Sequence, residues 1–216
     1  MIGDLKERLR ANTMFLLEFR YDFEAAHRFL SSNSERCQTP HGHSWSAKVR
    51  FTSFDRQLCS NQMLEEFSVL KAHWKTFIQG TVDHSFFHHV EDPLARVMEK
   101  EIPQFRGLPF PGDPTTELIS VCFFRKMIQM NRSVFGESPR VFPVAVEIQE
   151  TKTNRVVLEA EDELELIRSV PEFVRWSGWW EDSDPHSRII KSAETVSRPW
   201  SLPLRSSSEK KEERIN

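Results

Sequence analysis

Residues 27–45 read HRFLSSNSERCQTPHGHSW and contain three histidines and one cysteine: His27, His41, His43 and Cys37. His41 and His43 open a segment in which apolar residues alternate with others, so in a strand both imidazoles project from one face. Gly42 between them removes a side chain at a point where the backbone can be approached closely. Two imidazoles on one face, joined by a third from a neighbouring strand, would form a zinc site.

Alternating segments extend outward from this stretch in both directions. Apolar side chains from Phe15 to Phe23 alternate with charged ones, which predicts a half-buried strand whose parity His27 continues. A second strand is expected over residues 43–53, and it would pair antiparallel with the first so that the apolar faces agree. Two later segments, 144–150 and 156–160, predict another strand pair joined by the turn TKTNR.

Two amphipathic segments lie between the strand pairs. The first carries apolar residues at spacings of three and four, namely Met63, Phe67, Leu70, Trp74 and Phe77. Gly80 is expected to end this helix. A second helix is expected to start with Asp113 as N-cap and Pro114 at its first position, and to run to about Met130. The order of elements predicts an α+β fold with an antiparallel four-stranded sheet and two helices packed on one face.

Composition narrows the class of protein. The chain has 216 residues with a formal net charge of −3, which gives no argument for a nucleic-acid or anionic-membrane partner. No apolar run approaches the ~20 residues of a membrane span, and the charged segment MIGDLKERLR lacks the apolar core of a signal peptide. Its three cysteines show no paired spacing, so a reducing, cytoplasmic location is expected.

The character of the chain changes along its length. We expect a polar lead-in over residues 1–13, one folded domain over 14–168 and a tryptophan-rich extension over 169–216 that ends in disorder. The tryptophans of this extension, Trp176, Trp179, Trp180 and Trp200, favour surface packing or a contact between subunits over a ligand site.

Five segments in order carry a family resemblance: FEAAHRFL (23–30), CQTPHGHSW (37–45), DHSFF (83–87), PTTELIS (114–120) and IQETKTN (148–154). Together they resemble the 6-pyruvoyltetrahydropterin synthase superfamily, over roughly residues 14–161. The three residues between Cys37 and His41 are similar to the branch that makes 6-carboxytetrahydropterin in queuosine and deazapurine biosynthesis. The branch that makes the biopterin precursor has a longer gap.

The resemblance implies a set of site residues and a T-fold, the tunnelling-fold type of sheet with helices on one face. By this resemblance, we expect His27, His41 and His43 to hold zinc. It also implies catalytic roles for Cys37, Asp83, His84 and Glu150, and substrate binding by Glu150, Thr115 and Thr116. The implied reaction converts 7,8-dihydroneopterin triphosphate to 6-carboxytetrahydropterin with loss of triphosphate and acetaldehyde. The resemblance also implies a homo-oligomer, usually a hexamer, with sites between subunits.

Each of these residues has a plainer interpretation. Cys37 is either an inert loop thiol or a fourth ligand that closes a structural zinc site, although an open fourth position is typical of catalytic zinc. Asp83-His84 alone is a common turn, and Thr115-Thr116 are ordinary first-turn residues. Glu150 follows the apolar parity of its strand, where an unpaired carboxylate is costly, so a structural ion pair with an arginine is its alternative. The wider alternatives are a 6-pyruvoyltetrahydropterin synthase and a zinc-stabilised, non-catalytic pterin-binding module.

Overall fold

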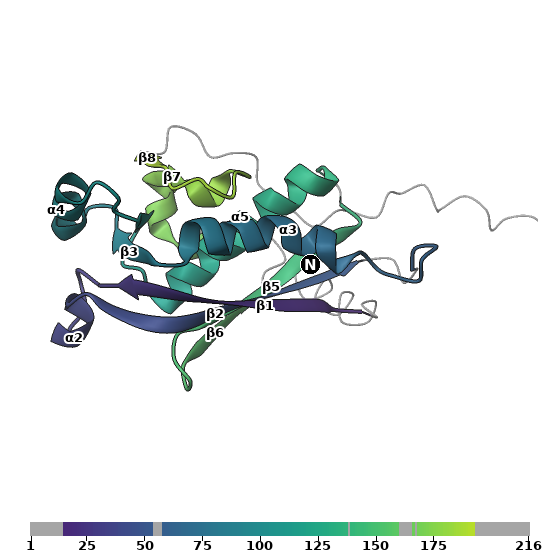
Figure 1. The fold of residues 1–216 in the computed structure, drawn as a ribbon, viewed down its shortest axis with the longest axis horizontal. Helices are drawn as coiled ribbons and strands as arrows, with labels where there is room; N and C mark the ends of the chain where they lie inside the picture. The colour runs from purple at the N-terminus through teal and green to yellow at the C-terminus, as the bar shows by residue number, and fades with distance from the viewer. Residues whose placement is uncertain (1–14, 54–57, 138, 160–165, 167, 193–216) are drawn as a thin grey trace, which may run out of the picture.

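A mixed β-sheet forms the base of the molecule in the computed structural model, which describes residues 15–53, 58–137, 139–159, 166 and 168–192 (Figure 1). The sheet has six strands in the order β4-β3-β1-β2-β5-β6. Helices cover one of its faces, and the C-terminal segment lies on the far side of these helices (Figure 1). The predicted lead-in over residues 1–13 and the predicted disordered end lie outside the described residues.

Four strands pair antiparallel as the sequence pattern predicts. Their bounds are Leu17–His27 for β1, His41–Ser53 for β2, Val141–Gln149 for β5 and Arg155–Glu159 for β6. β2 pairs with both β1 and β5, and β5 pairs with β6. The α+β class is therefore confirmed for the described residues.

The predicted four-stranded antiparallel sheet is wrong in strand number and direction. Two short strands, β3 (Ser85–His89) and β4 (Gly107–Phe110), extend the sheet beyond β1 and run parallel to their neighbours. They contain SFFHH and GLPF, which are too short to show alternation. β3 pairs with β1 only over Ala25–His27, so this addition falls beside the histidine-bearing strand end.

Helices α3 (Phe67–Phe77) and α5 (Thr116–Phe135) cover one face of the sheet (Figure 1). α3 starts later than predicted. Met63, which was expected on its apolar face, lies before the helix and is 49% exposed. It also does not end at Gly80, since a π-helical turn, η1 (Ile78–Val82), follows it directly. Two shorter helices, α2 (Glu35–Gln38) and α4 (Pro93–Glu101), were not predicted.

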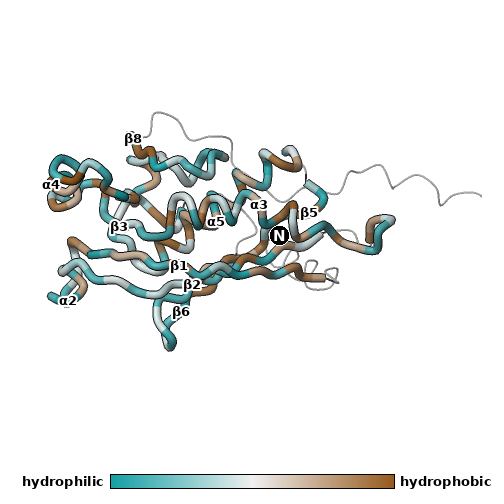
Figure 2. The backbone as a smooth tube through the Cα atoms, in the orientation of Figure 1, coloured by the Kyte–Doolittle hydropathy of each residue, from teal (hydrophilic) through white to brown (hydrophobic). Residues whose placement is uncertain are grey.

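The core lies between the sheet and the two long helices. β1 and β2 contribute alternate residues, so Phe23 and Trp45 stack with ring centroids 6.2 Å apart, and Phe123 of α5 packs on Phe23 at 6.2 Å. Hydropathy along the backbone matches this arrangement, since β5 is largely hydrophobic while the turn before β6 is hydrophilic (Figure 2). The apolar face of the alternating pattern is therefore the face that the helices bury.

The other face of the sheet carries charged side chains. Glu18 bonds Arg50 at 2.7 Å, and Glu147 lies 3.3 Å from both Lys48 and Arg50. No helix among the described residues covers the middle of this face (Figure 1). The two faces of the sheet therefore have different chemistry, which matters for the placement of the site.

The C-terminal segment packs on α5 through two buried cations. It comprises η2 (Pro171–Val174), β7 (Trp176–Gly178), η3 (Trp179–Glu181) and β8 (Ile190–Ser192). The Arg125 guanidinium donates to Glu181 at 2.7 Å and lies over the Phe173 ring. Lys126 Nζ donates to carbonyls of Trp179, Asp182 and Asp184 and to the Asp182 carboxylate at 2.6–2.9 Å. Burial lowers the pKa of Lys126, although Asp182 and Asp184 act in the opposite direction.

The prediction of surface packing is wrong for two of the tryptophans. Trp179 and Trp180 have no exposed surface, and the Trp179 indole donates to the Pro109 carbonyl at 2.7 Å. They belong to the chain's own core. None of the described helices is long and apolar enough to cross a membrane.

Replacing Lys126 tests this docking. Lys126→Met keeps most of the side-chain volume but removes the donor from buried oxygens, so we expect a loss in the free energy of unfolding of about 3 kcal/mol. Urea denaturation measures it. Lys100→Met is the control, since Lys100 is exposed and its ion pair is with the neighbouring, exposed Glu101. An unchanged unfolding midpoint for Lys126→Met would contradict the assignment.

Candidate metal and catalytic site

Three histidines converge where β1 and β2 meet at the end of the sheet. His27 lies directly opposite His41 in the antiparallel register, and Ala25 lies opposite His43. All three side chains therefore project from the face that carries Trp45 and the core. One ring nitrogen from each histidine lies within 4.8 Å of the others, and these residues form the one group of this kind found among the described residues. The structure thus brings together the three predicted ligands.

Backbone carbonyls set the tautomers of two of these rings. His27 Nδ1 lies 3.1 Å from the Pro114 carbonyl oxygen, and His41 Nδ1 lies 2.8 Å from that of Thr39. Since a carbonyl only accepts, each Nδ1 carries the proton and each Nε2 of a neutral ring has a lone pair. The two Nε2 atoms are 3.0 Å apart, where lone pairs repel unless a proton or cation lies between them. A second hydrogen bond that orients the ring in this way is typical of metal-binding histidines.

Burial favours the neutral, metal-binding form of two of the three histidines. The pKa of His27 is lowered to about 4, first by burial and then by His41 and His43, while the Pro114 carbonyl acts in the opposite direction. Burial also lowers the pKa of His43, although the Glu150 carboxylate raises it. A neutral imidazole is the ligand form, so these shifts favour binding of a cation near pH 7.

Zinc fits this donor set. It prefers nitrogen ligands with Zn–N bonds of about 2.0–2.1 Å, which places tetrahedral nitrogen pairs on the order of 3.3 Å apart. The Nε2 pair of His27 and His41 is close to this spacing at 3.0 Å. Three histidine ligands leave a fourth position for another group, which is the pattern of catalytic zinc.

Glu150 lies beside the histidines at the start of the turn between β5 and β6. Its Oε1 atom is 3.6 Å from His27 Nε2 and 3.9 Å from His43 Nε2. The backbone N–H of Glu150 donates to Asn154 across the turn. None of the arginines in the described part of the chain forms an ion pair with Glu150, so the alternative of a structural arginine partner is not what the structure shows.

The threonines at the start of α5 lie next to the cluster through Pro114. Thr115 is the N-cap, and its hydroxyl accepts from the Leu118 N–H at 3.3 Å; half-buried Thr116 begins the helix. The prediction of Asp113 as N-cap is wrong. The Asp113 carboxylate instead accepts from the backbone N–H groups of Leu30 and Ser31 at 2.6 and 2.8 Å, so it ties down the loop after His27.

Cys37 lies in that same loop, in the one-turn helix α2, and is half-buried. Its carbonyl accepts from the Phe29 N–H at 2.8 Å. Cys37 is outside the group of three ligand atoms within 4.8 Å. The interpretation as a fourth ligand that closes the site therefore has no support in this geometry.

A second contact that holds this loop, an ion pair, was not predicted. Arg28 follows His27, and its guanidinium forms two bonds with the buried Asp92 carboxylate, Nε to Oδ2 at 2.8 Å and Nη2 to Oδ1 at 3.0 Å. Asp92 is also the N-cap of α4, accepting from Leu94. A proline directly after an aspartate was the available sequence signal for this cap. The residues that precede Cys37 in this loop are thus held by the side chains of Asp92 and Asp113, far away in the sequence.

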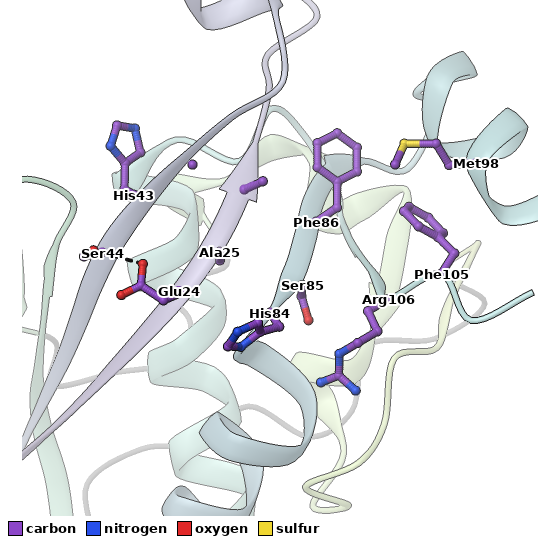
Figure 3. Close-up of a pocket in the computed structure, with 12 residues that line it drawn as sticks. Glu24, Ala25, His43, Ser44, His84, Ser85, Phe86, Met98, Phe105 and Arg106 are labelled. Atoms are coloured by element: carbon purple, nitrogen blue, oxygen red, sulfur yellow. Dashed lines mark hydrogen bonds between the residues drawn. The ribbon is translucent and has the colours of Figure 1, made fainter. Parts of the chain in front are cut away.

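Asp83 and His84 form a bonded pair at a different place. Asp83 Oδ2 lies 2.9 Å from His84 Nδ1, and Asp83 Oδ1 accepts from the Glu24 N–H at 2.9 Å. Burial raises the pKa of Asp83, but the bonds from Glu24 and His84 outweigh it and leave the pKa lowered. His84 has a φ of 57° and an exposed side chain that lines a cavity of about 470 Å³ (Figure 3).

This cavity opens on the charged face of the sheet. Ala26 lies opposite both Gly42 and Phe86 in the strand registers, and all three line the cavity. Neighbouring positions on a strand face opposite ways, so this floor is on the other side of the sheet from the His27 and His41 rings. His43 also lines the cavity, but Figure 3 shows its ring directed away from His84. Within one chain, the His27 and His41 rings and the Asp83–His84 pair therefore lie on different faces of the sheet.

Comparisons with known proteins agree with this architecture. The family model described as 6-pyruvoyl tetrahydropterin synthase matches residues 16–161. A 6-carboxy-5,6,7,8-tetrahydropterin synthase of Synechocystis is 27% identical over 115 residues, which cover 50% of this chain and 88% of that protein. The family resemblance of the five segments is confirmed.

Two solved structures are similar in fold. An uncharacterized protein from Wolinella succinogenes has a TM-score of 0.55 and 20% identity, covering 68% of this chain and 98% of that one. A 6-pyruvoyl tetrahydropterin synthase from Plasmodium vivax has a TM-score of 0.50 and 14% identity, with the same coverage. In both comparisons about a third of this chain has no counterpart in the other structure.

Removing one histidine tests the metal site. We expect the wild-type chain to hold roughly one zinc ion and His41→Ala to bind it more than about 100-fold more weakly, since loss of an outer partner alone costs about 10- to 100-fold. Metal analysis after dialysis against a weak chelator measures this. His73→Ala, an exposed position on α3, is the control. Equal zinc in all three proteins would exclude the cluster as the site.

Proposed function

Because this chain belongs to the 6-pyruvoyl tetrahydropterin synthase family, we propose that it is a zinc-dependent lyase that converts 7,8-dihydroneopterin triphosphate to 6-carboxytetrahydropterin. Triphosphate and acetaldehyde leave in this reaction, which belongs to queuosine and deazapurine synthesis. The observation that carries the proposal is the convergence of three imidazoles at one strand end. The gap of three residues between Cys37 and His41, and the name of the Synechocystis relative, support the carboxy-forming branch.

The cluster of His27, His41 and His43 would hold the ion. When bound, zinc would supply a Lewis acid that polarises an oxygen of the substrate side chain. Glu150 would accept two N–H bonds from the guanidine-like edge of the pterin, an arrangement that a carboxylate accepts in bidentate fashion. Its position beside His27 and His43 supports binding of the ring next to the metal ligands.

Proton transfer would fall to Cys37 and His84. Cys37, as thiolate, would remove and return protons at the side-chain carbons of the substrate. His84 would act as the second acid–base group through Nε2, because its Nδ1 is held by Asp83 at 2.9 Å. A carboxylate that orients an imidazole in this way is a recurrent arrangement in acid–base catalysis.

The two-faced arrangement supports an oligomer. The His27 and His41 rings lie on the opposite face of the sheet from His84 in one chain, so one chain alone does not bring all the proposed groups to one substrate. We propose a homo-oligomer, a hexamer by resemblance, in which Asp83 and His84 of one chain serve the histidine cluster of a second chain. The exposed His84 side chain is available for such a contact.

Cys37→Ala tests the reaction and the role of the thiol together. We expect full zinc content but a fall in turnover of roughly 100- to 10,000-fold, the usual contribution of a positioned acid–base group. Mass spectrometry of the wild-type product identifies 6-carboxytetrahydropterin, whereas a 6-pyruvoyl product would assign the chain to the other branch. Cys59→Ala is the matched control, since Cys59 is exposed and lies in a different loop. Binding of the pterin without any turnover by the wild type would favour the non-catalytic module.

Mixed assembly tests the shared site. His41→Ala and His84→Ala chains are expected to be nearly inactive alone, because each lacks one half of every site. Co-expressed as a mixed oligomer they should regain roughly one quarter of wild-type activity, since random assembly pairs an intact cluster with an intact dyad that often. Absence of any recovery in a zinc-loaded mixed oligomer would place both halves in the same chain.

A further inference from the structure

The loop that carries Asp83 and His84 has an irregular backbone. It leaves the π-helical turn η1, a form that is rare and frequent at functional sites, and places His84 at a φ of 57°. A left-handed conformation is unfavourable for a residue other than glycine and persists only where the surroundings hold it. The Ser85 hydroxyl contributes by donating to the Thr81 carbonyl at 2.6 Å across the loop.

Arg188 of the C-terminal segment binds both ends of this loop. Its Nη1 donates to the Gly107 carbonyl at 2.9 Å and to Ser85 Oγ at 3.2 Å. Its Nη2 donates to Ser85 Oγ at 3.2 Å and to the Thr81 carbonyl. Thr81 and Ser85 are buried at 1% and 3% exposure, and they flank the Asp83–His84 pair. One guanidinium therefore links the two ends of the loop, at Thr81 and Ser85, to each other and to β4.

Two neighbours of Arg188 bind the same turn. The Thr81 hydroxyl donates to the Pro185 carbonyl at 2.7 Å. A side chain at position 80 would come within 3.0 Å of the His186 ring, so Gly80 provides the space for that ring. Gly80 was expected to end a helix, and its observed role is to let the C-terminal segment approach.

Arg188 remains a cation in this position. Burial, and then the nearby Arg106, lower its pKa to about 10, which leaves it protonated near pH 7. Arg106 donates to the Gly80 and Asp83 carbonyls at 2.9 and 3.0 Å from the solvent side of the same loop. The carbonyls of residues 80, 81 and 83 are thus bonded by two arginines.

We propose that Arg188 is a positioning residue for His84, so that a segment outside the family match at residues 16–161 sets the geometry of the acid–base pair. The inference rests on the proposed function for the role of His84 in turnover, but the geometry of the pair can be measured without any substrate. Loss of the guanidinium would leave the Thr81 and Gly107 carbonyls without this donor, and a misplacement of about 1 Å costs on the order of 100-fold in rate.

Nuclear magnetic resonance of labelled histidine tests the positioning directly, with His84 assigned from the signal that is lost in His84→Asn. In the wild type, the bond to Asp83 should hold the His84 proton on Nδ1. In Arg188→Gln, we expect the two imidazole tautomers of His84 to mix, while zinc content stays that of the wild type. With dihydroneopterin triphosphate, kcat should fall by roughly 10- to 100-fold and KM should change less than about threefold.

Arg175→Gln is the matched control, because Arg175 lies in the same segment but binds Glu91 and Trp176 instead of the loop. It should keep the wild-type tautomer and kcat. If Arg188→Gln fails to fold, Arg188→Lys decides by the same measurements, since a lysine keeps the charge without the planar fork. A wild-type tautomer and kcat in the folded variant would overturn the proposal. A wild-type chain that never turns over the pterin would refute the proposed function and leave the tautomer result standing.

Discussion

The antiparallel register between β1 and β2 is the constraint on which the candidate site depends. It places His27 opposite His41 and puts His43 on the same face, two residues along β2 from His41. Because side chains alternate along a strand, a slip of one residue would carry histidines and core aromatics to the opposite face together. Burial of Phe23 and Trp45 therefore keeps the register, and the register keeps the metal ligands together. The packing of the core and the geometry of the histidine cluster therefore depend on the same strand register.

The sequence predicted those features that depend on regular alternation of side chains along a strand or on ordered motifs. The parity of His27, His41 and His43, the two antiparallel strand pairs and the family followed from long, regular segments and ordered motifs. β3 and β4 escaped prediction because four or five residues are too few for a period, and their parallel pairing depends on the loops that bring them to β1. Asp113 was wrongly predicted as an N-cap because an aspartate before a proline favours that role. Its carboxylate instead accepts from two backbone N–H groups of a distant loop.

The placement of Asp83 and His84 on the charged face of the sheet could also not be predicted from the sequence. Asp83-His84 has no periodicity, and its direction depends on a left-handed backbone that holds His84 on the charged face. Trp179 and Trp180 looked like surface residues because charged residues surround them in sequence. They are buried because Arg125 and Lys126, two charges within an otherwise apolar helix face, bind the acidic groups and carbonyls next to them. Removing the partner of a buried cation is strongly destabilising, so the stability of α5 and the placement of the C-terminal segment depend on each other.

The bond between Arg188 and Thr81 has a consequence for the order of folding. The two residues are 107 positions apart in the sequence, far beyond the separation of the β1–β2 contacts. Long loops close late because the loss of chain entropy precedes the gain from contact. The sheet and α5 present the surface on which the C-terminal segment docks, so we expect the arginine to arrive after both have formed. The segment of the family domain that carries His84 would then be completed by residues synthesised after that domain.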